Sequence, residues 1–595
     1  MARSAFLTST RRWLRVLLAS AGAVLVLVAG SRARGLAETA DFAGVLWLWV
    51  VGVLLFLAAF DLPETIRDVL QPLQRMDRRR WLEFSLLVAL AVGSLVVRAI
   101  DLEHIPLNVG GDEGTWGVEG LAMLEGGRMA NPFSTRWFAF PSMSFLAWGV
   151  AMQVFGETIA GLRSLSVLLG AASIVTTFLL ARELFGRRIG WLATILLACS
   201  HYHIHYSRLA YNNIADDLFI TLSLWLLLRG LRTERTGYYA LAGAVMGLGW
   251  YGYTGARLIG LVAGVYLAHQ LWGERRWDAR RWQHLVLLAG AALVVAAPLL
   301  LHYAGHPDTF DARSQQVSVF ASGWLEREVV ITGRSAGRLM LEQFWKSISA
   351  FNYTRDPTFI YRPGFPLLDL VSGIFFVAGL MWSTAHWRRL SSGLLLTWFW
   401  SAIIFGLTIT ENPPASQRVV IVAPAVCLLA ALGLNWLAGV SRRLFDGGTQ
   451  LWRGAVGVVL VLVVALNLRF YFLVYTPTRV YGNPTAEIAT ELARHLQERG
   501  DDRPLYFYGP PHMYWDFGTL RFMVPDVQGV DVPPRDSGQA VDLDVSQGAW
   551  FVFVPQRIGE LDAVRTEYPG GDEEHVYSTA DGHLVYVMYQ VGPQP

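Results

Sequence analysis

The sequence predicts a polytopic α-helical membrane protein that carries a soluble α/β domain at its C-terminal end. Its 595 residues are 53% hydrophobic and only 16% charged, whereas soluble globular chains are about 25% charged. Apolar runs recur up to residue 475, and the acidic segment that follows has a net charge of −10 against +12 for the rest. This composition excludes a disordered chain, a disulfide scaffold and an ordinary soluble enzyme.

Helices that cross a bilayer need about 17–25 mostly apolar residues. Fourteen apolar runs are candidates for such helices: 12–29, 42–60, 82–99, 138–155, 159–180, 188–204, 213–230, 237–251, 255–271, 284–302, 367–383, 392–409, 419–438 and 453–475. Six of the loops between these runs are rich in arginine, and the positive-inside rule predicts that such loops are cytoplasmic. These loops are Arg75–Arg80, Arg182–Arg188, Arg229–Arg235, Arg275–Arg281, Arg388–Arg389 and Arg442–Arg453.

Keeping every arginine loop on one side requires that the run 138–155 does not cross the membrane. We therefore expect this run to be a juxtamembrane or re-entrant helix, which leaves about thirteen spans with a cytoplasmic N-terminus and an extracytoplasmic C-terminus. Residues 1–80 would hold two extra helices and a cytoplasmic loop. Residues 81–475 would form the main membrane domain with outer loops at 100–158 and 303–366, and residues 476–595 the soluble domain.

The acidic tail has the pattern of an α/β domain. Asn483-Pro484 suits a helix start, and Ile488, Leu492 and Leu496 give an amphipathic helix that ends at Gly500. Strand-like runs follow at Leu505–Tyr508, Trp550–Val554 and Leu584–Tyr589. No catalytic spacing occurs in this segment, so a folding or acceptor-docking module is the expected role.

The strongest local signal is Gly110-Gly111-Asp112-Glu113, which follows an outward span. Glycines let a backbone turn tightly beside a ligand, and a partly desolvated carboxylate can act as a general base. The alternative is a helix N-cap, for which aspartate is well suited. Glu113 could instead hold a divalent cation, although no second ligand is evident from the sequence.

Arginines at the outer ends of spans form a second signal. These are Arg163, Arg208, Arg257 and Arg418. Guanidinium groups can grip a phosphate with two parallel hydrogen bonds, whereas at a span end they could merely snorkel to the interface.

Three further groups lie on the same predicted face. His201, His203 and His205 alternate at the end of a helix, where metal binding is less expected than interfacial or substrate contacts. Asp216 and Asp217 lie near the outer end of the next span, where an acidic pair suggests function, with capping as the alternative. Arg362 belongs to a Pro- and Gly-containing loop that could cover a site.

These residues together resemble the GT-C glycosyltransferases, in particular the protein O-mannosyltransferase and aminoarabinose-transferase superfamily of glycosyltransferase family 39 type. The resemblance covers roughly residues 80–475. The matching pieces are Asp112-Glu113, Phe155–Leu165, Ala181–Gly186, Ser207-Arg208, Tyr253–Arg257, Asn352–Asp369 and Arg418 with Pro424. Many relatives carry an aspartate shortly after the arginine matching Arg208; here Asn212 and Asn213 stand there, and Asp216 or Asp217 would substitute.

The resemblance implies a GT-C fold enzyme that moves a monosaccharide from a polyprenyl-phosphate donor to a hydroxyl acceptor on the outer face. Asp112 would be the base, with Glu113 beside it. Arg163, Arg208, Tyr253, Arg257, Asp216, Asp217, Arg362 and Arg418 would contact substrates. One base with direct displacement would invert the anomeric centre. The acceptor could be a protein, a lipid or a glycan.

We expect a multi-pass protein of the plasma (inner) membrane, with membrane lipid as a partner. No nucleic-acid partner is expected, because the arginines are scattered rather than gathered on one face. The main alternative is a lipid-linked oligosaccharide polymerase or ligase, which would use a pyrophosphate-linked donor. A transporter is less favoured because the sequence shows no internal repeat, and a non-catalytic scaffold is the remaining alternative.

Overall fold

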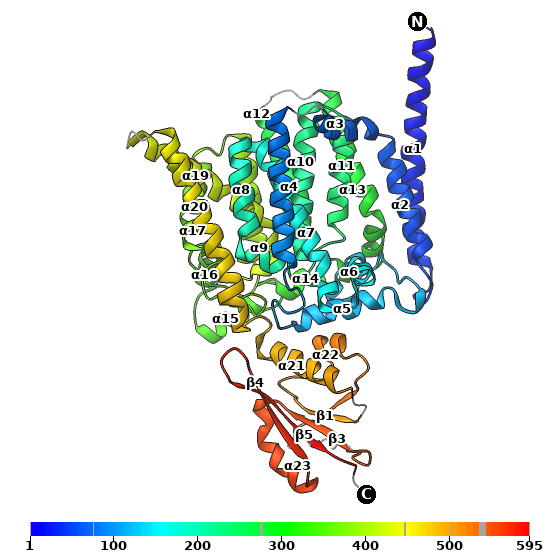
Figure 1. Ribbon diagram of the computed structural model, residues 1–595. Helices are drawn as coiled ribbons and strands as arrows, with labels where there is room; N and C mark the ends of the chain where they lie inside the picture. Colours follow the sequence, from blue (N-terminus) through cyan, green and yellow to red (C-terminus); the bar gives the residue numbers. More distant parts are fainter. Residues whose placement is uncertain are drawn as a thin grey trace.

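The computed structural model describes residues 2–74, 77–273, 278–444, 448–500, 503–534 and 543–593. It shows a large helical bundle with a small sheet domain at one end (Figure 1). Each of the fourteen apolar runs contains helix. The polytopic helical fold with a C-terminal α/β domain is therefore confirmed.

The bundle contains twenty α-helices within the described residues. They are α1 Ala2–Gly35, α2 Ala43–Ala58, α3 Leu62–Gln74, α4 Arg78–Ala99, α5 Gly111–Ala122, α6 Ser142–Phe155, α7 Ile159–Phe185, α8 Arg187–Cys199, α9 His201–Tyr206, α10 Asn213–Thr233, α11 Thr236–Gly249, α12 Leu258–Gly273, α13 Ala279–Gly305, α14 Pro307–Val317, α15 Trp324–Thr332, α16 Ala336–Ile348, α17 Leu370–Ala385, α18 Leu390–Ala402, α19 Ala423–Leu444 and α20 Thr449–Arg469.

Seven helical segments in the described parts of the chain are long and apolar enough to cross a membrane by themselves, and the bent pair α2–α3 would make an eighth. The other apolar runs form helices that are shorter or carry more charge. The expected total of about thirteen spans therefore stays a prediction. The segment Ser416–Leu444, which includes α19, is the most enclosed of the seven, with 89% of its apolar window buried.

Helix α6 is the part of run 138–155 that is helical, and its 14 residues would measure about 21 Å at 1.5 Å per residue. That length is less than the roughly 30 Å of a bilayer core. The helix packs between α5 and α7 near the sheet domain (Figure 1). Helix α11, in the expected span 237–251, has the same length, so the placement of run 138–155 outside the membrane stays a prediction.

The two N-terminal helices pack tightly against each other and against α13. A side chain at Gly22 of α1 would lie 2.5 Å from the Gly52 carbonyl oxygen of α2, so the glycines permit the close approach. Trp49 of α2 donates a 3.0 Å hydrogen bond to the Val295 carbonyl of α13. These helices are thus an integral part of the bundle.

The C-terminal region forms a five-stranded mixed sheet with strand order β2-β1-β3-β5-β4. The strands are β1 Leu505–Tyr508, β2 Gly529–Asp531, β3 Ala549–Phe553, β4 Asp572–Tyr577 and β5 Leu584–Val591, accompanied by α21 Asn483–Arg499, α22 Gly518–Met523 and α23 Leu561–Glu567. Strand β1 runs parallel to β2 and β3, and β5 is antiparallel to β3 and β4. The sequence predicted β1, β3, β5 and α21, but not the short β2 or the exposed, charged β4.

Candidate active site

The acidic motif lies at the start of α5, on the end of the bundle that meets the sheet domain (Figure 1). Gly110 is the N-cap of this helix, and Asp112 and Glu113 occupy its first turn. The structure therefore does not use Asp112 as the N-cap. Two negative charges in a first turn are still favourable, because they face the positive end of the helix dipole.

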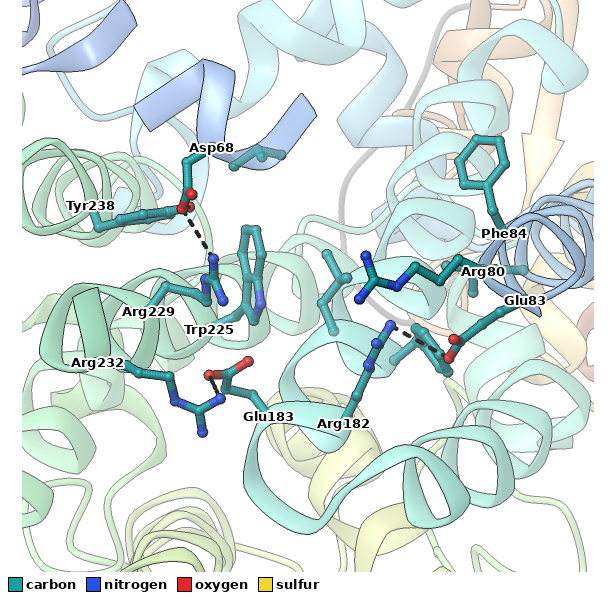
Figure 2. A pocket seen from close by; sticks show the side chains of 14 residues that line it. Asp68, Arg80, Glu83, Phe84, Arg182, Glu183, Trp225, Arg229, Arg232 and Tyr238 are labelled. Atoms are coloured by element: carbon teal, nitrogen blue, oxygen red, sulfur yellow. Dashed lines mark hydrogen bonds and ion pairs between the residues drawn. The ribbon is translucent and has the colours of Figure 1, made fainter. Parts of the chain in front are cut away.

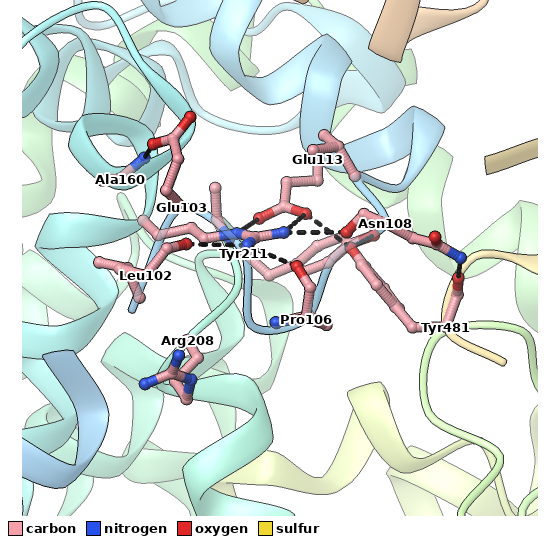
Figure 3. A network of polar contacts seen from close by, with 12 residues as sticks. Leu102, Glu103, Pro106, Asn108, Glu113, Ala160, Arg208, Tyr211 and Tyr481 are labelled. Atoms are coloured by element: carbon pink, nitrogen blue, oxygen red, sulfur yellow. Dashed lines mark hydrogen bonds and ion pairs between the residues drawn. The ribbon is translucent and has the colours of Figure 1, made fainter. Parts of the chain in front are cut away.

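Glu113 is fully buried and bound from several directions (Figure 3). Arg163 grips it with two hydrogen bonds, from Nε to Oε1 at 2.8 Å and from Nη2 to Oε2 at 3.0 Å. The Ala210 amide donates to Oε1 at 3.1 Å, and the Tyr481 hydroxyl donates to Oε2 at 3.0 Å. Four donors thus converge on one carboxylate, and neither oxygen is free for a cation or a substrate.

Asp112, its neighbour, is in the opposite situation. Its carboxylate is partly exposed and makes no hydrogen bond or ion pair with the residues that the structure describes. Burial raises the pKa of the Asp112 carboxyl above its ordinary value, and the positive charge of Arg313 opposes that rise. A partly desolvated carboxylate without a partner has the properties of a general base.

Two of the four predicted arginines are used internally. Besides Glu113, Arg163 donates to the carbonyls of Leu102, Pro106 and Asn108. Arg208 is also fully buried. It donates to five carbonyls in the segment that ends α4 and follows it: Val97, Arg98, Ile100, Asp101 and Ile105. Both guanidinium groups stabilise the polypeptide near α5 and would have to leave these partners before they could bind a phosphate.

The other two arginines, Arg257 and Arg418, line one cavity of about 260 Å³ together with Tyr253 and Arg313. Arg257 donates to the Phe310 carbonyl at 2.9 Å and the Tyr303 hydroxyl at 3.2 Å. The Nε atoms of Arg313 and Arg418 are buried without a hydrogen-bond partner. Three guanidinium groups around one cavity form a strongly positive site, which we call the arginine cavity.

Arg313 was not singled out by the sequence. It lies on α14 in the second large loop, where no motif marks it. Its guanidinium stacks on Phe138 at 5.4 Å and on Phe140 at 5.8 Å. Phe140 in turn packs 5.9 Å from Tyr253. Arg313 thus lines the arginine cavity, and its charge also acts on Asp112.

Asp216 holds the turn from which Tyr253 and Arg257 project. Its buried carboxylate lies against the backbone of this turn, beside Gly252 and Gly255. A side chain at Gly255 would come within 2.5 Å of the Asp216 carboxylate, so that position requires glycine. Asp216 therefore supports the turn that carries two residues of the arginine cavity, although it does not line the cavity itself. Its neighbour Asp217 points elsewhere, with its Oδ2 3.3 Å from His203 Nε2.

The three alternating histidines diverge and contact different partners. His201 binds the Tyr361 hydroxyl, His203 lies 2.7 Å from an Arg98 nitrogen, and His205 lies 2.8 Å from the Ile360 carbonyl oxygen. No group of three or more potential metal ligands occurs within the described residues. Arg362 is exposed on its loop, donates to the Pro357 carbonyl at 3.1 Å, and does not line the arginine cavity.

The C-terminal region is hydrogen-bonded to the segment that immediately precedes Asp112. Asn108 donates to the carbonyls of Arg479 and Tyr481 at 2.8 and 3.0 Å. The Val109 amide donates to Thr490, and Thr519 donates to the Val109 carbonyl. These contacts fix the backbone immediately before the acidic pair.

Two glycines of α5 allow the helix to pack closely against the C-terminal region. A side chain at Gly114 would lie 2.4 Å from the backbone of Gly518 in α22, and one at Gly111 would lie 2.5 Å from the Phe517 ring. The glycine-rich motif thus serves the packing of α5 against the sheet domain. From the sequence alone, glycines that allow close helix packing look the same as glycines that let the backbone approach a ligand.

Comparison with known proteins gives matches to part of the chain. The profile of the dolichyl-phosphate-mannose-protein mannosyltransferase family matches residues 140–302. The undecaprenyl phosphate-alpha-4-amino-4-deoxy-L-arabinose arabinosyl transferase of Pseudomonas aeruginosa strain UCBPP-PA14 is 32% identical over 223 residues, which are 35% of this chain and 38% of that protein. An uncharacterized protein of Aquifex aeolicus is 23% identical over 338 residues, which are 56% of this chain and 59% of that protein. The matches thus span less than two thirds of the length of these relatives.

Solved structures extend the similarity to most of the fold. The structure of ArnT from Cupriavidus metallidurans in the apo state superposes with a TM-score of 0.54 and 17% identity, covering 86% of this chain and 99% of that one. The same protein bound to undecaprenyl phosphate gives a TM-score of 0.53 with 17% identity over 87% and 100% of the two chains. At this identity the likeness establishes a shared fold.

Proposed function

We propose that this chain, a GT-C fold membrane protein of the protein O-mannosyltransferase and aminoarabinose-transferase type, is a glycosyltransferase that moves a monosaccharide from a polyprenyl-phosphate donor to a hydroxyl acceptor. Two observations carry the proposal: Asp112 is partly desolvated and has no partner among the described residues, and Arg313, whose charge acts on Asp112, lines a cavity with two other arginines. The related arabinosyl transferases are named for an undecaprenyl-phosphate sugar, which is a donor of this class.

Asp112 acts as the general base in this proposal. The acceptor oxygen forms a bond to the anomeric carbon of the sugar, and its proton moves to the Asp112 carboxylate. The bond between the anomeric carbon and the phosphate oxygen breaks, and the polyprenyl phosphate leaves with the electron pair. A single displacement of this kind inverts the anomeric configuration.

Arg257, Arg313 and Arg418 hold the donor phosphate. Negative charge grows on the phosphate as it leaves, and cations already held around the cavity stabilise that charge without reorganising. The buried Nε atoms of Arg313 and Arg418 have no partner within the described structure, so both retain donors for an incoming oxygen. Tyr253 lines the same cavity and Asp216 positions its turn.

Glu113, Arg163 and Arg208 are positioning residues in this proposal. The Glu113–Arg163 pair ties α5 to α7, and Arg208 secures the end of α4. Their contacts keep Asp112 at a fixed place relative to the arginine cavity. Precise placement matters because the acceptor, the sugar and the base must align within a few tenths of an ångström.

We place the site on the outer face of the plasma (inner) membrane. The arginine-rich loops meet at one end of the bundle, where Arg182 pairs with Glu83, Arg229 with Asp68 and Arg232 with Glu183. The sheet domain, α5 and α6 lie at the opposite end (Figure 1). By the positive-inside rule this arrangement supports a cytoplasmic N-terminus and an extracytoplasmic C-terminal domain.

Donor analysis with the purified full-length chain tests the proposal. Labelled polyprenyl-phosphate monosaccharides and a pyrophosphate-linked oligosaccharide would be supplied as donors, and release of the lipid product would be measured alongside sugar transfer. We expect turnover with at least one of the monosaccharide donors and a loss of about 10²–10⁴-fold in Asp112→Asn, the usual contribution of a general base. Turnover only with a pyrophosphate-linked oligosaccharide would instead indicate a polymerase or ligase, and full activity in Asp112→Asn would refute the assigned base.

A further inference from the structure

A second cavity lies at the end of the bundle away from the sheet domain, among the arginine-rich loops. It has a volume of about 490 Å³ and lies between α3, α4, α7 and α10 (Figure 2). We call it the basal pocket. Because it is at the other end of the bundle from Asp112, the proposed glycosyl transfer does not use it.

Charge in and around the basal pocket is unbalanced. Three carboxylates are present, and each already has a cationic partner: Asp68 lies 3.0 Å from Arg229, Glu83 lies 3.4 Å from Arg182, and Glu183 lies 2.8 Å from Arg232. Arg187 and Arg235 lie within 3.2 and 3.7 Å of the same carboxylates from outside the pocket. Including Arg80, six arginines face three carboxylates.

Arg80 is the cation without a carboxylate. Its side chain extends into the pocket (Figure 2) and makes no hydrogen bond or ion pair with any residue that the structure describes. The neighbouring arginines are held in place by their ion pairs, and Arg80 is therefore the group that an incoming anion would meet first. Guanidinium groups favour phosphate because they match its oxygens with parallel donors.

The remaining walls of the pocket are apolar, with Phe84, Leu87, Phe178 and Trp225 among them. Helix α3 forms one rim and turns by 76° from α2, so that it lies across the end of the bundle. This helix exposes Ile66, Val69 and Leu70. An amphipathic helix with exposed apolar side chains beside basic residues is typical of the membrane interface.

We propose that the basal pocket binds the phosphate headgroup of an anionic phospholipid, with Arg80 as its main ligand. Basic pockets between membrane helices on the cytoplasmic side take such headgroups. The apolar walls and the exposed face of α3 favour a lipid over a free anion. Part of the N-terminal region, residues 1–80, thereby contributes to lipid binding, because α3 supplies Asp68 and Val69 to the basal pocket.

Lipid binding to the purified full-length chain in detergent tests this site by native mass spectrometry. The probes are dioleoyl phosphatidylglycerol, dioleoyl phosphatidylcholine and inorganic phosphate. We expect phosphatidylglycerol to bind in preference to phosphatidylcholine, and Arg80→Gln to weaken that binding about tenfold, as expected for one charge-assisted contact. Arg79→Gln is the matched control, because Arg79 is the neighbouring arginine on α4 and does not line the pocket.

Each other outcome overturns the proposal. Unchanged phosphatidylglycerol affinity in Arg80→Gln would exclude the site, and equal weakening in Arg79→Gln would show only diffuse surface attraction. Competition by millimolar inorganic phosphate to the same extent as by the lipid would assign the pocket to a free anion. Because the Arg80 side chain has no partner among the residues placed in the structure, Arg80→Gln is expected to fold, and the lipid-binding result does not depend on transferase activity.

Discussion

Replacing Glu113 by glutamine should destabilise the protein, whereas the equivalent change at its neighbour Asp112 should not. Glu113 is completely buried and receives donors from Arg163, Ala210 and Tyr481. Glutamine keeps one acceptor oxygen but turns an NH₂ donor toward groups that are themselves donors. It also leaves the Arg163 guanidinium buried without a counter-charge.

The expected size of the effect follows from that loss. Removing one partner of a buried ion pair costs about 3–5 kcal/mol. Since 1.4 kcal/mol is a factor of ten in an equilibrium constant, the unfolded fraction should rise by about 10²–10⁴-fold. Glu119 on the same helix provides the control, because its pair with Arg136 is partly exposed and Glu119→Gln should cost about 1 kcal/mol or less.

Asp112→Asn should behave differently in the same assay. Folding raises the pKa of Asp112, so the native protein binds its proton more tightly than the unfolded chain does. The charged form therefore opposes folding once the pH exceeds the unfolded value of about 4. Removing the charge at neutral pH should leave stability equal or slightly higher, although sugar transfer is lost.

Thermal unfolding of the purified variants in detergent would measure these differences, with sugar transfer recorded on the same samples. The expected order of stability is Asp112→Asn at or above wild type, Glu119→Gln near wild type, and Glu113→Gln far below. Wild-type stability in Glu113→Gln would refute the structural assignment of Glu113. A collapse of Asp112→Asn would show that Asp112 also has a structural role.

Three further predictions follow from the same region. Transfer activity should fall at acidic pH as Asp112 is protonated. Arg313→Gln should shift this fall to higher pH, because Arg313 lowers the Asp112 pKa. A pH–rate profile in which the fall stays at the same pH would show that Arg313 does not act on Asp112. Tyr481→Phe should cost about 1.5–3 kcal/mol through the lost bond to Glu113, and a thermal midpoint equal to that of wild type would contradict the bond. Gly114→Ala should force α5 away from α22 and cost about 1–3 kcal/mol, whereas Gly337→Ala, which meets open space on α16, should be neutral or stabilising in the same thermal scan.

The helical bundle and the C-terminal α/β domain could both be predicted from the amino-acid sequence. A bilayer requires long apolar helices, and an α/β domain requires short apolar strands, so both leave a direct pattern in the chain. Strand β1 was predicted with the bounds Leu505–Tyr508 that the structure shows, and α21 ends at the predicted glycine. Strand β4 was missed because its exposed residues, Asp572–Tyr577, are largely charged and polar.

The roles of the charged residues could not be predicted in this way, because they depend on contacts between distant parts of the chain. Asp112 and Glu113 are adjacent and chemically alike, yet Asp112 has no partner among the described residues and Glu113 is bound by four donors. Arg163 and Arg208 cannot be distinguished from Arg257 and Arg418 by their place at span ends, but the first pair is taken up by backbone carbonyls. Arg313 reaches the cavity from a loop without any motif. The physical reason is that helical periodicity is a local property, whereas a charge acquires its role from partners that the fold brings from up to several hundred residues away.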